Sequence, residues 1–112
     1  MTIKAVFVGI NKHFDASIPE LGGARRDATA LWALFTDTVQ GLSGQLLVDE
    51  AAMHAEVSQA ILGTLSAADQ EDVVVITFAG HGSPDGNLVL YDTSAPPVGG
   101  MLERDRNTTE AI

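Results

Sequence analysis

The clearest chemical signal in this sequence is a histidine, His81, that lies two residues beyond the end of an apolar segment, residues 73–79, and stands between two glycines. An imidazole can act as a general acid and a general base near neutral pH. The next residue, Gly82, lets a substrate backbone approach closely and frees its own N–H to donate a hydrogen bond. A histidine beside such a donor makes half of an acyl-transfer site, a general acid/base with one oxyanion donor. The alternative interpretation is a loop histidine whose glycines only shape a turn.

The other polar residues give weaker signals. We expect His13, in the loop after the first apolar segment, to be solvated, and His54 to lie on exposed helix surface. Ser83 has no evident base partner, so we do not expect it to be a nucleophile. A metal site drawn from His81, Asp85 and Asp92 has no diagnostic spacing, and we expect no metal.

The composition narrows the class of protein. The chain has 112 residues, 46% of them apolar, a formal net charge of −9 and no cysteine. These values fit one small globular domain, or part of one, and argue against a nucleic-acid binder or an anionic-membrane partner. No run of about 18 apolar residues and no signal peptide is found, so a cytoplasmic location is expected. The lack of cysteine excludes disulfides and any thiol nucleophile within this chain.

Alternating strand and helix patterns must position these groups. Apolar runs of strand length predict strands at residues 3–10, 45–48, 73–79 and 88–91. Apolar residues at three-and-four spacing predict one helix over residues 24–39 and a second after Asp49, its expected N-cap. This order predicts a parallel sheet with helices on both faces. Ligands of such sheets bind at the carboxyl ends of the strands, where residues 11–23 and 80–87 form loops.

Each predicted helix carries one apolar stripe that should face the sheet. The first stripe comprises Ala24, Ala28, Leu31, Leu34, Phe35 and Val39. The second comprises Met53, Val57, Ala60, Ile61 and Leu65. Arg25 and Arg26 open the first helix, where basic side chains oppose the helix dipole. We interpret them as a solvated corner, with a binding role as the alternative.

Four segments, taken in order, resemble the caspase-like cysteine peptidases, most closely the bacterial metacaspase branch. They are an apolar strand ending in Gly-Ile-Asn, the helix start Leu-Gly-Gly-Ala-Arg-Arg-Asp-Ala, an apolar strand ending in Gly-His-Gly, and the segment Leu-Val-Leu-Tyr-Asp. The resemblance covers residues 3–92. It implies a caspase-like three-layer α/β sandwich, present here as a partial domain. Residues 1–92 would be the N-terminal half of the catalytic domain, and residues 93–112 a linker or disordered tail.

The resemblance also implies roles for individual residues. His81 would match the catalytic histidine, and Gly82 the glycine whose N–H contributes to the oxyanion hole. Asp27 matches the aspartate at the helix start and would be structural or near the substrate pocket, and Arg25 is a second candidate for substrate binding. The implied activity is that of a metacaspase-type (peptidase C14) cysteine endopeptidase, cleaving peptides or proteins after basic residues.

The absence of cysteine departs from this family. The thiolate is the nucleophile, so this chain alone cannot perform the family's reaction. A complementary cysteine-bearing chain or segment would supply it. The alternatives are an inactive pseudo-protease that serves as an interaction module, and a small flavodoxin-like ligand-binding domain. Residues 15–23 contain no arginine of the kind that caspases use to select aspartate.

The remaining expectations concern cofactors and partners. We expect no cofactor; calcium enters only by analogy with calcium-dependent metacaspases, and residues 69–72 and 85–92 lack the spacing of a known calcium loop. Arg104 and Arg106 would be candidate processing sites in a basic-specific relative. A partial domain should expose apolar surface and should therefore associate with itself or with a complementary chain.

Overall fold

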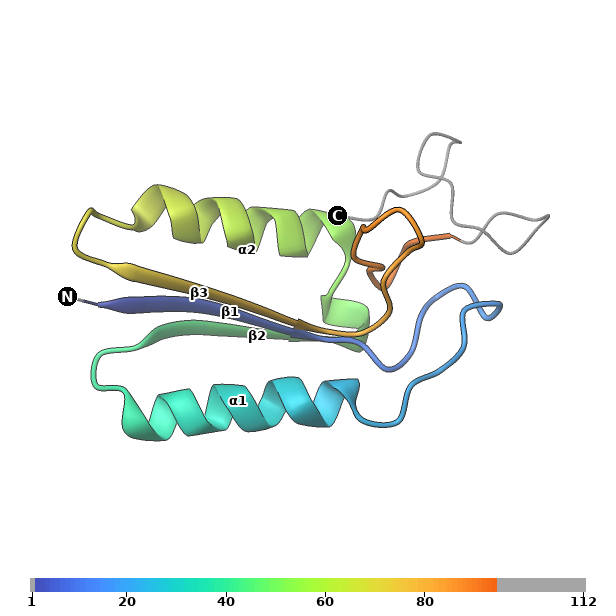
Figure 1. Cartoon of the computed structure of the whole chain (residues 1–112), viewed down its shortest axis with the longest axis horizontal. Helices are drawn as coiled ribbons and strands as arrows, with labels where there is room; N and C mark the ends of the chain where they lie inside the picture. The colour runs from blue at the N-terminus through green and yellow to red at the C-terminus, as the bar shows by residue number, and fades with distance from the viewer. Residues whose placement is uncertain (1, 95–112) are drawn as a thin grey trace.

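Three parallel strands form one sheet in the computed structural model, which describes residues 2–94. The strands are β1 (Ile3–Gly9), β2 (Ser43–Val48) and β3 (Val73–Ala79), in the spatial order β2-β1-β3. Helix α1 (Ala24–Thr38) covers one face of the sheet and helix α2 (His54–Ala67) covers the other, which gives the three layers seen in Figure 1. The predicted fold class, a parallel sheet with helices on both faces, is confirmed.

The central strand, β1, is the most deeply buried element. Its residues from Ala5 onward are buried, and Ile10, which follows it, is completely so. Val6 and Val8 pack with Val57 of α2 in the main apolar cluster. A strand that is paired on both edges and covered on both faces needs a near-continuous apolar run, which residues 3–10 provide.

Gly9 allows α1 to lie close to the end of β1. A Cβ atom at Gly9 would lie 2.5 Å from the Cβ of Ala28 and 2.6 Å from the carbonyl oxygen of Ala24. Both are buried small residues of α1. The first turn of α1 therefore rests directly on the carboxyl end of β1, beside the loop that follows this strand.

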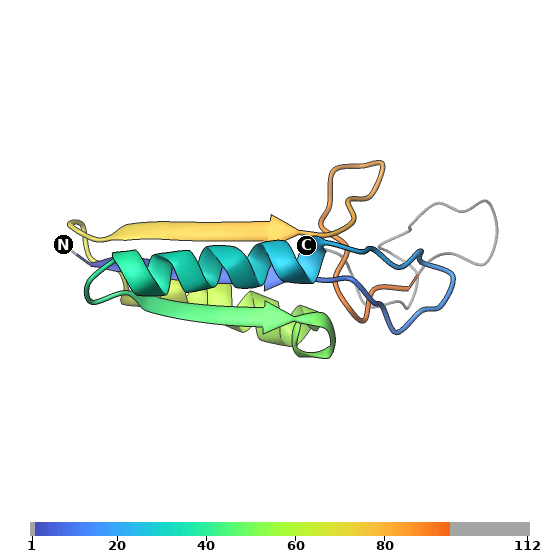
Figure 2. The same cartoon turned by 90° about the horizontal axis from the view of Figure 1, so that it is seen from below.

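The sheet is not covered evenly. Figure 2 shows α1 running along the middle of the sheet, with β3 and β2 at its two edges. The strand predicted at residues 73–79 is confirmed, but no strand pairs with its outer edge within residues 2–94. Two of its apolar residues, Val73 and Ile76, remain 42% and 40% exposed. A bare strand edge beside apolar surface favours association.

The expectation that Asp49 caps the second helix is wrong. Asp49 begins a short 3-10 turn, η1 (Asp49–Ala51), and α2 starts only after Met53. The acceptor at the start of α2 comes instead from far along the chain, because the carboxylate of Asp92 accepts a hydrogen bond from the His54 N–H at 2.9 Å. The carboxylate of Asp49 is used by the β1 loop, as described below.

The strand predicted at residues 88–91 is also absent. This segment makes one isolated antiparallel bridge, between Gly82 and Leu88. The hydrogen bond of 3.0 Å from the Val89 N–H to the His81 carbonyl oxygen closes one side of this bridge, and the Tyr91 N–H bonds to the Ala52 carbonyl oxygen at 3.0 Å. Val89 is nevertheless buried. The apolar pattern thus marks burial correctly, although the partners are loop carbonyls and not a neighbouring strand.

The predicted apolar stripes of both helices are only partly buried. The stripe residues that are fully buried are Ala24, Ala28, Val57 and Ala60. Larger stripe residues are exposed, contrary to the expectation: Leu31, Leu34, Met53 and Leu65. The helices therefore approach the sheet mainly through small side chains, and part of their apolar surface stays in solvent.

The described part of the chain has two further features. Neither of its helices has the length and apolar character needed to cross a bilayer. Of the tail expected at residues 93–112, only Thr93 and Ser94 are described, so the proposed tail, with Arg104 and Arg106, otherwise lies outside the described residues. Thr93 is buried, and its hydroxyl oxygen accepts the Leu90 N–H at 3.0 Å.

Candidate active site

Two loops meet at the carboxyl edge of the sheet, as the parallel topology predicts. The loop after β1, residues 10–23, and the segment after β3, residues 80–94, both extend beyond the same end of the strands (Figure 1). A backbone hydrogen bond of 3.0 Å from the Phe14 N–H to the Tyr91 carbonyl oxygen ties them together. This edge is where His81 lies.

His81 is held by a carbonyl group of the β1 loop. Its Nε2 atom lies 2.7 Å from the carbonyl oxygen of Pro19. Because a carbonyl oxygen can only accept, this nitrogen carries a proton. In the neutral ring Nδ1 then keeps the lone pair and is the atom that can accept a proton. The contact fixes both the orientation of the ring and its tautomer, as the orienting group of a catalytic triad does.

Gly82 follows His81, and its N–H makes no hydrogen bond in the antiparallel bridge between Gly82 and Leu88. The bridge between Gly82 and Leu88 is closed by hydrogen bonds of the flanking residues, including one of 2.8 Å from the Ser83 N–H to the Asn87 carbonyl oxygen. The Gly82 N–H takes no part in this pairing. A Cβ atom placed on Gly82 would have the Asn87 oxygen as its nearest neighbour, at 3.8 Å. The space around this glycine is open, which an oxyanion donor requires.

The expectation that His13 is solvated is wrong, because the β1 loop folds back and places His13 against His81. The two ring centroids are 5.6 Å apart, with an angle of 49° between the rings. Both ring nitrogens of His13 are buried, and neither makes a hydrogen bond of ordinary geometry within residues 2–94. Burial lowers the pKa of His13 from 6.5, and the neighbouring His81 lowers it further. His13 is therefore uncharged at neutral pH.

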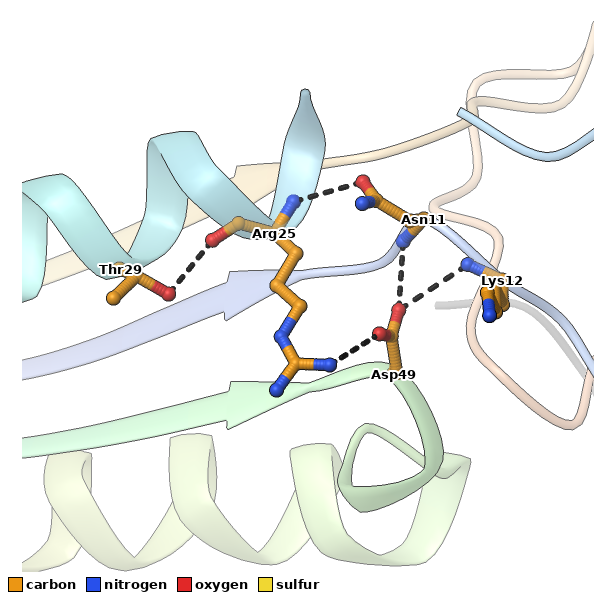
Figure 3. A network of polar contacts seen from close by, with 5 residues as sticks. All are labelled: Asn11, Lys12, Arg25, Thr29 and Asp49. Atoms are coloured by element: carbon orange, nitrogen blue, oxygen red, sulfur yellow. Dashed lines mark hydrogen bonds and ion pairs between the residues drawn. The ribbon is translucent and has the colours of Figure 1, made fainter. Parts of the chain in front are cut away.

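A buried carboxylate, that of Asp49, anchors the β1 loop (Figure 3). One oxygen accepts the backbone N–H groups of Asn11 at 2.8 Å and Lys12 at 3.2 Å. The other accepts the guanidinium of Arg25 at 3.1 Å. Burial acts to raise the pKa of Asp49, but the hydrogen bonds from these donors outweigh burial and lower the pKa below 3.8. Asp49 is consequently a charged, fully engaged acceptor at neutral pH.

Asn11 links the end of β1 to the first turn of α1 (Figure 3). Its side-chain oxygen accepts the Arg25 N–H at 2.9 Å, and its backbone carbonyl accepts the Leu21 N–H at 2.9 Å. The N-cap of α1 is Gly23, which has no side chain to serve as a cap. Asn11 supplies that acceptor from another element. These bonds fix both ends of the loop that carries Pro19.

The two residues predicted to bind substrate have different surroundings. Arg25 is not simply a solvated corner, because its ion pair with Asp49 holds a side chain that is still 56% exposed. Arg25 also lines a shallow groove of about 480 Å³ along α1, together with Arg26. Asp27 is exposed, and its Oδ1 atom lies 3.9 Å from Nε of Arg26. Neither Arg25 nor Asp27 makes a hydrogen bond or ion pair with His81 in the described part of the chain.

Ser83 and Asp85 belong to a tight turn. The Ser83 hydroxyl donates to the Asp85 carboxylate and accepts the Asn87 N–H at 3.0 Å. Gly86, with a φ of 88°, closes the turn. No group of three or more His, Asp or Glu side chains suited to a metal ion occurs among residues 2–94. These residues shape the segment after His81.

Sequence reasoning missed the groups that surround His81. Pro19 contributes only its backbone carbonyl, and residue type does not predict which backbone carbonyl will accept a hydrogen bond from a side chain. His13 lies in an irregular loop whose path no periodicity predicts. The one available signal is Asn11 at the end of an apolar strand, since a short polar side chain there commonly bonds to nearby backbone.

Comparisons with known proteins agree with this architecture. A family model described as the caspase domain of peptidase family C14 matches residues 2–108. The crystal structure of a protein from Geobacter sulfurreducens is similar over 93% of this chain, with a TM-score of 0.71 and 22% sequence identity. This chain covers 42% of that protein's length, and the likeness shows a shared fold. No curated protein matches the sequence.

The family match spans nearly the whole chain and includes every element that positions His81. It therefore sets aside the flavodoxin-like alternative. The three layers, the parallel sheet and the match together lead to one conclusion about relationship: this chain belongs to the caspase-domain family of peptidases, C14.

Proposed function

We propose that this chain supplies the general acid/base and one oxyanion donor of a cysteine endopeptidase that cleaves proteins or peptides after basic residues. The observation that carries the proposal is the 2.7 Å contact between His81 Nε2 and the Pro19 carbonyl oxygen. It leaves Nδ1 as the proton acceptor of the ring. The adjacent Gly82 N–H, which the local backbone pairing does not use, supports it.

The proposed chemistry uses these two groups in sequence. His81 Nδ1 takes the proton of a cysteine thiol, and the thiolate attacks the scissile carbonyl carbon to form a C–S bond. The carbonyl oxygen becomes negative and accepts the Gly82 N–H. His81 then donates its proton to the leaving amine as the C–N bond breaks. Water then attacks the thioester carbon as His81 takes a proton from the water, the C–S bond breaks, and His81 returns that proton to the departing sulfur.

The cysteine must come from outside these 112 residues, which contain none. The chain spans less than half of the related Geobacter protein, so a protein of that size has room for a second segment beside β3. We place the thiol on such a segment, in the same native polypeptide or in a complementary chain.

Three features bear on substrate choice. The net charge of −9 favours the approach of basic peptides. Arg25 is paired with Asp49, which reduces its ability to receive an acidic side chain. Asp27 is exposed, and we propose it as a carboxylate that contacts a basic substrate. Arg25 would contact substrate only through the groove that it lines.

An inactive pseudo-protease that serves as an interaction module is the second candidate. The absence of cysteine favours it. In that case the apolar surface around the edge of β3 would bind a partner, and His81 would have no part in the binding.

The test is a peptidase assay of the natively purified protein with everything that copurifies. The substrates are fluorogenic peptides with Arg, Lys or Asp before the scissile bond. Wild type is compared with His81→Ala and with His54→Ala, a control histidine at the start of α2 whose backbone N–H, and not its side chain, bonds to Asp92. We expect cleavage after Arg and Lys, a loss of about 10²- to 10⁴-fold in kcat/KM for His81→Ala, and no loss for His54→Ala.

Each other result has a definite meaning. Cleavage that survives His81→Ala removes His81 from the mechanism. Cleavage after Asp but not after Arg or Lys contradicts the specificity. A native protein with a bound partner, no reactive thiol and no cleavage supports the interaction module.

A further inference from the structure

One group at the carboxyl edge is explained neither by folding nor by the chemistry above. Both ring nitrogens of His13 are buried and make no hydrogen bond of ordinary geometry with any described residue. A phenylalanine would fill the same space without leaving polar atoms unpaired, so packing alone does not account for an imidazole. The ring lies against His81, with 5.6 Å between the centroids.

The carboxylates near His13 are already engaged with other donors. Asp49, on η1, accepts the guanidinium of Arg25 and two backbone N–H groups. Asp15, in the same loop as His13, accepts the N–H and the hydroxyl of Ser17 at 2.9 and 2.6 Å. A protonated imidazole carries two N–H donors that both need acceptors. A charged His13 would therefore find only the backbone of Val89 as a further acceptor, in a contact that falls short of ordinary hydrogen-bond geometry.

The electrostatic balance points the same way. Burial is the largest cause that lowers the pKa of His13 from 6.5, and His81, on the segment after β3, is the next. Asp49, Asp15 and the backbone of Val89 act to raise this pKa without reversing the shift. The uncharged ring is the form that fits the site, and acid is needed to charge it.

We propose that His13 is a positioning residue for His81 and that its protonation in acid releases His81 from Pro19. The uncharged ring packs against the His81 imidazole and keeps Nε2 on the Pro19 carbonyl. A charged His13 is drawn toward solvent and leaves that packing, so the His81 ring loses its support. The effect of this change on catalysis rests on the proposed function of His81. The contacts among His13, His81 and Pro19 lie within this chain and do not depend on that function.

The test is NMR of the histidine side chains in the full 112-residue chain, because ¹⁵N shifts report the tautomer of each ring. Wild type is compared with His13→Phe, which keeps a ring but cannot be charged, and with His13→Ala, which removes both. His54→Gln assigns the signals of the third histidine. Protonation of His81 itself keeps the Nε2 proton in place, so loss of the bond to Pro19 reports a different event.

In wild type above neutral pH we expect His81 as a single Nε2–H tautomer. Below pH 6.5, the value from which the pKa of His13 is lowered, we expect the Nε2–H signal to disappear in the same step as His13 titrates. In His13→Phe the tautomer should persist and that acid step should vanish. In His13→Ala the single tautomer should give way to a mixture even above neutral pH.

Two results overturn the proposal: a His81 tautomer unchanged in His13→Ala, or an acid step that survives in His13→Phe. If His13→Ala does not fold, the acid step in His13→Phe decides alone. No readout here requires a cysteine. The positioning role can thus fail while the peptidase function stands, and loss of the function in the His81→Ala assay leaves this geometry intact.

Discussion

The two loops at the carboxyl edge are fastened in different ways. The loop after β1 is tied by the buried carboxylate of Asp49, which accepts three hydrogen bonds, and by the side chain of Asn11. On the segment after β3, the His81 side chain is held by one hydrogen bond to a carbonyl and one ring contact. The backbone of this segment is anchored elsewhere, by the buried Val89 and Leu90 and by the bond from the His54 N–H to Asp92. Under the proposed function His81 must exchange its proton, and a neutral acceptor and a neutral ring hold its side chain without fixing its charge.

The largest expected effect on stability comes from Asp49→Ala, which removes the carboxylate that anchors the loop after β1. Three donors lose a buried acceptor, and hydrogen bonds to a charged group contribute about 1.5–3 kcal/mol each. Because Arg25 is more than half exposed, its share is small. We expect the free energy of unfolding in urea to fall by about 3 kcal/mol, against about 1 kcal/mol for Arg25→Ala. Equal losses in the two variants would contradict the central place of Asp49.

Asp49 also makes stability depend on pH. Its pKa is lower in the folded protein than the ordinary 3.8, so its stabilising contribution is present above pH 3.8 and is lost as pH falls through the lowered value. Asp49→Asn keeps the side-chain shape and should remove this component of acid unfolding. The check is a series of urea titrations at decreasing pH, in which an unchanged slope for Asp49→Asn would oppose the assignment.

The next effect tests the contact between β1 and α1. Gly9→Ala places a Cβ atom within 2.6 Å of two buried atoms of α1. Overpacking of this kind costs about 1–3 kcal/mol, and we expect about 2 kcal/mol by urea unfolding. Gly63→Ala, in α2 with open space around it, is the matched control and should be neutral or stabilising. If Gly9→Ala left the free energy of unfolding unchanged, α1 would not be packed tightly against the end of β1.

A smaller effect concerns the bare edge of β3. Ile76 is 40% exposed, so Ile76→Lys should cost about 1 kcal/mol of folding stability. It should reduce self-association, or binding of a complementary chain, because a charged edge resists pairing. Light scattering measures the change, and Gln45→Lys on the opposite edge strand is the control. A wild-type chain that is a stable monomer with no partner would count against the edge as an association surface.

The smallest effect on stability should come from a substitution of His81, whose side chain makes few contacts. His81→Gln removes one hydrogen bond at a partly exposed position and should change the free energy of unfolding by only about 0.5 kcal/mol. The same variant removes a neighbour that lowers the pKa of His13, so that pKa should rise toward 6.5 in an NMR titration. The acid destabilisation due to His13, which develops below pH 6.5, should shrink with it. A large loss of stability would show that His81 is structural.

The fold was largely predictable, because β1 and β3 are long apolar runs and α1 begins and ends near clear turn signals. The position of His81 at the carboxyl edge followed from the parallel topology. The errors share one cause: Asp49, His13 and residues 88–91 take partners from distant parts of the chain, and local pattern carries no information about these. Asp49 looked like a helix cap because its own helix follows it, yet its oxygens bond to Asn11 and Lys12.

The proposed cysteine-peptidase site is best tested by the intact mass of the natively purified protein, with everything that copurifies, before and after alkylation of thiols. We expect a cysteine that reacts with the alkylating reagent, on a longer native polypeptide or on a partner present at one-to-one stoichiometry. A lone species of 11.7 kDa that takes up no alkyl group would contradict the assignment of His81 as half of a cysteine-peptidase site.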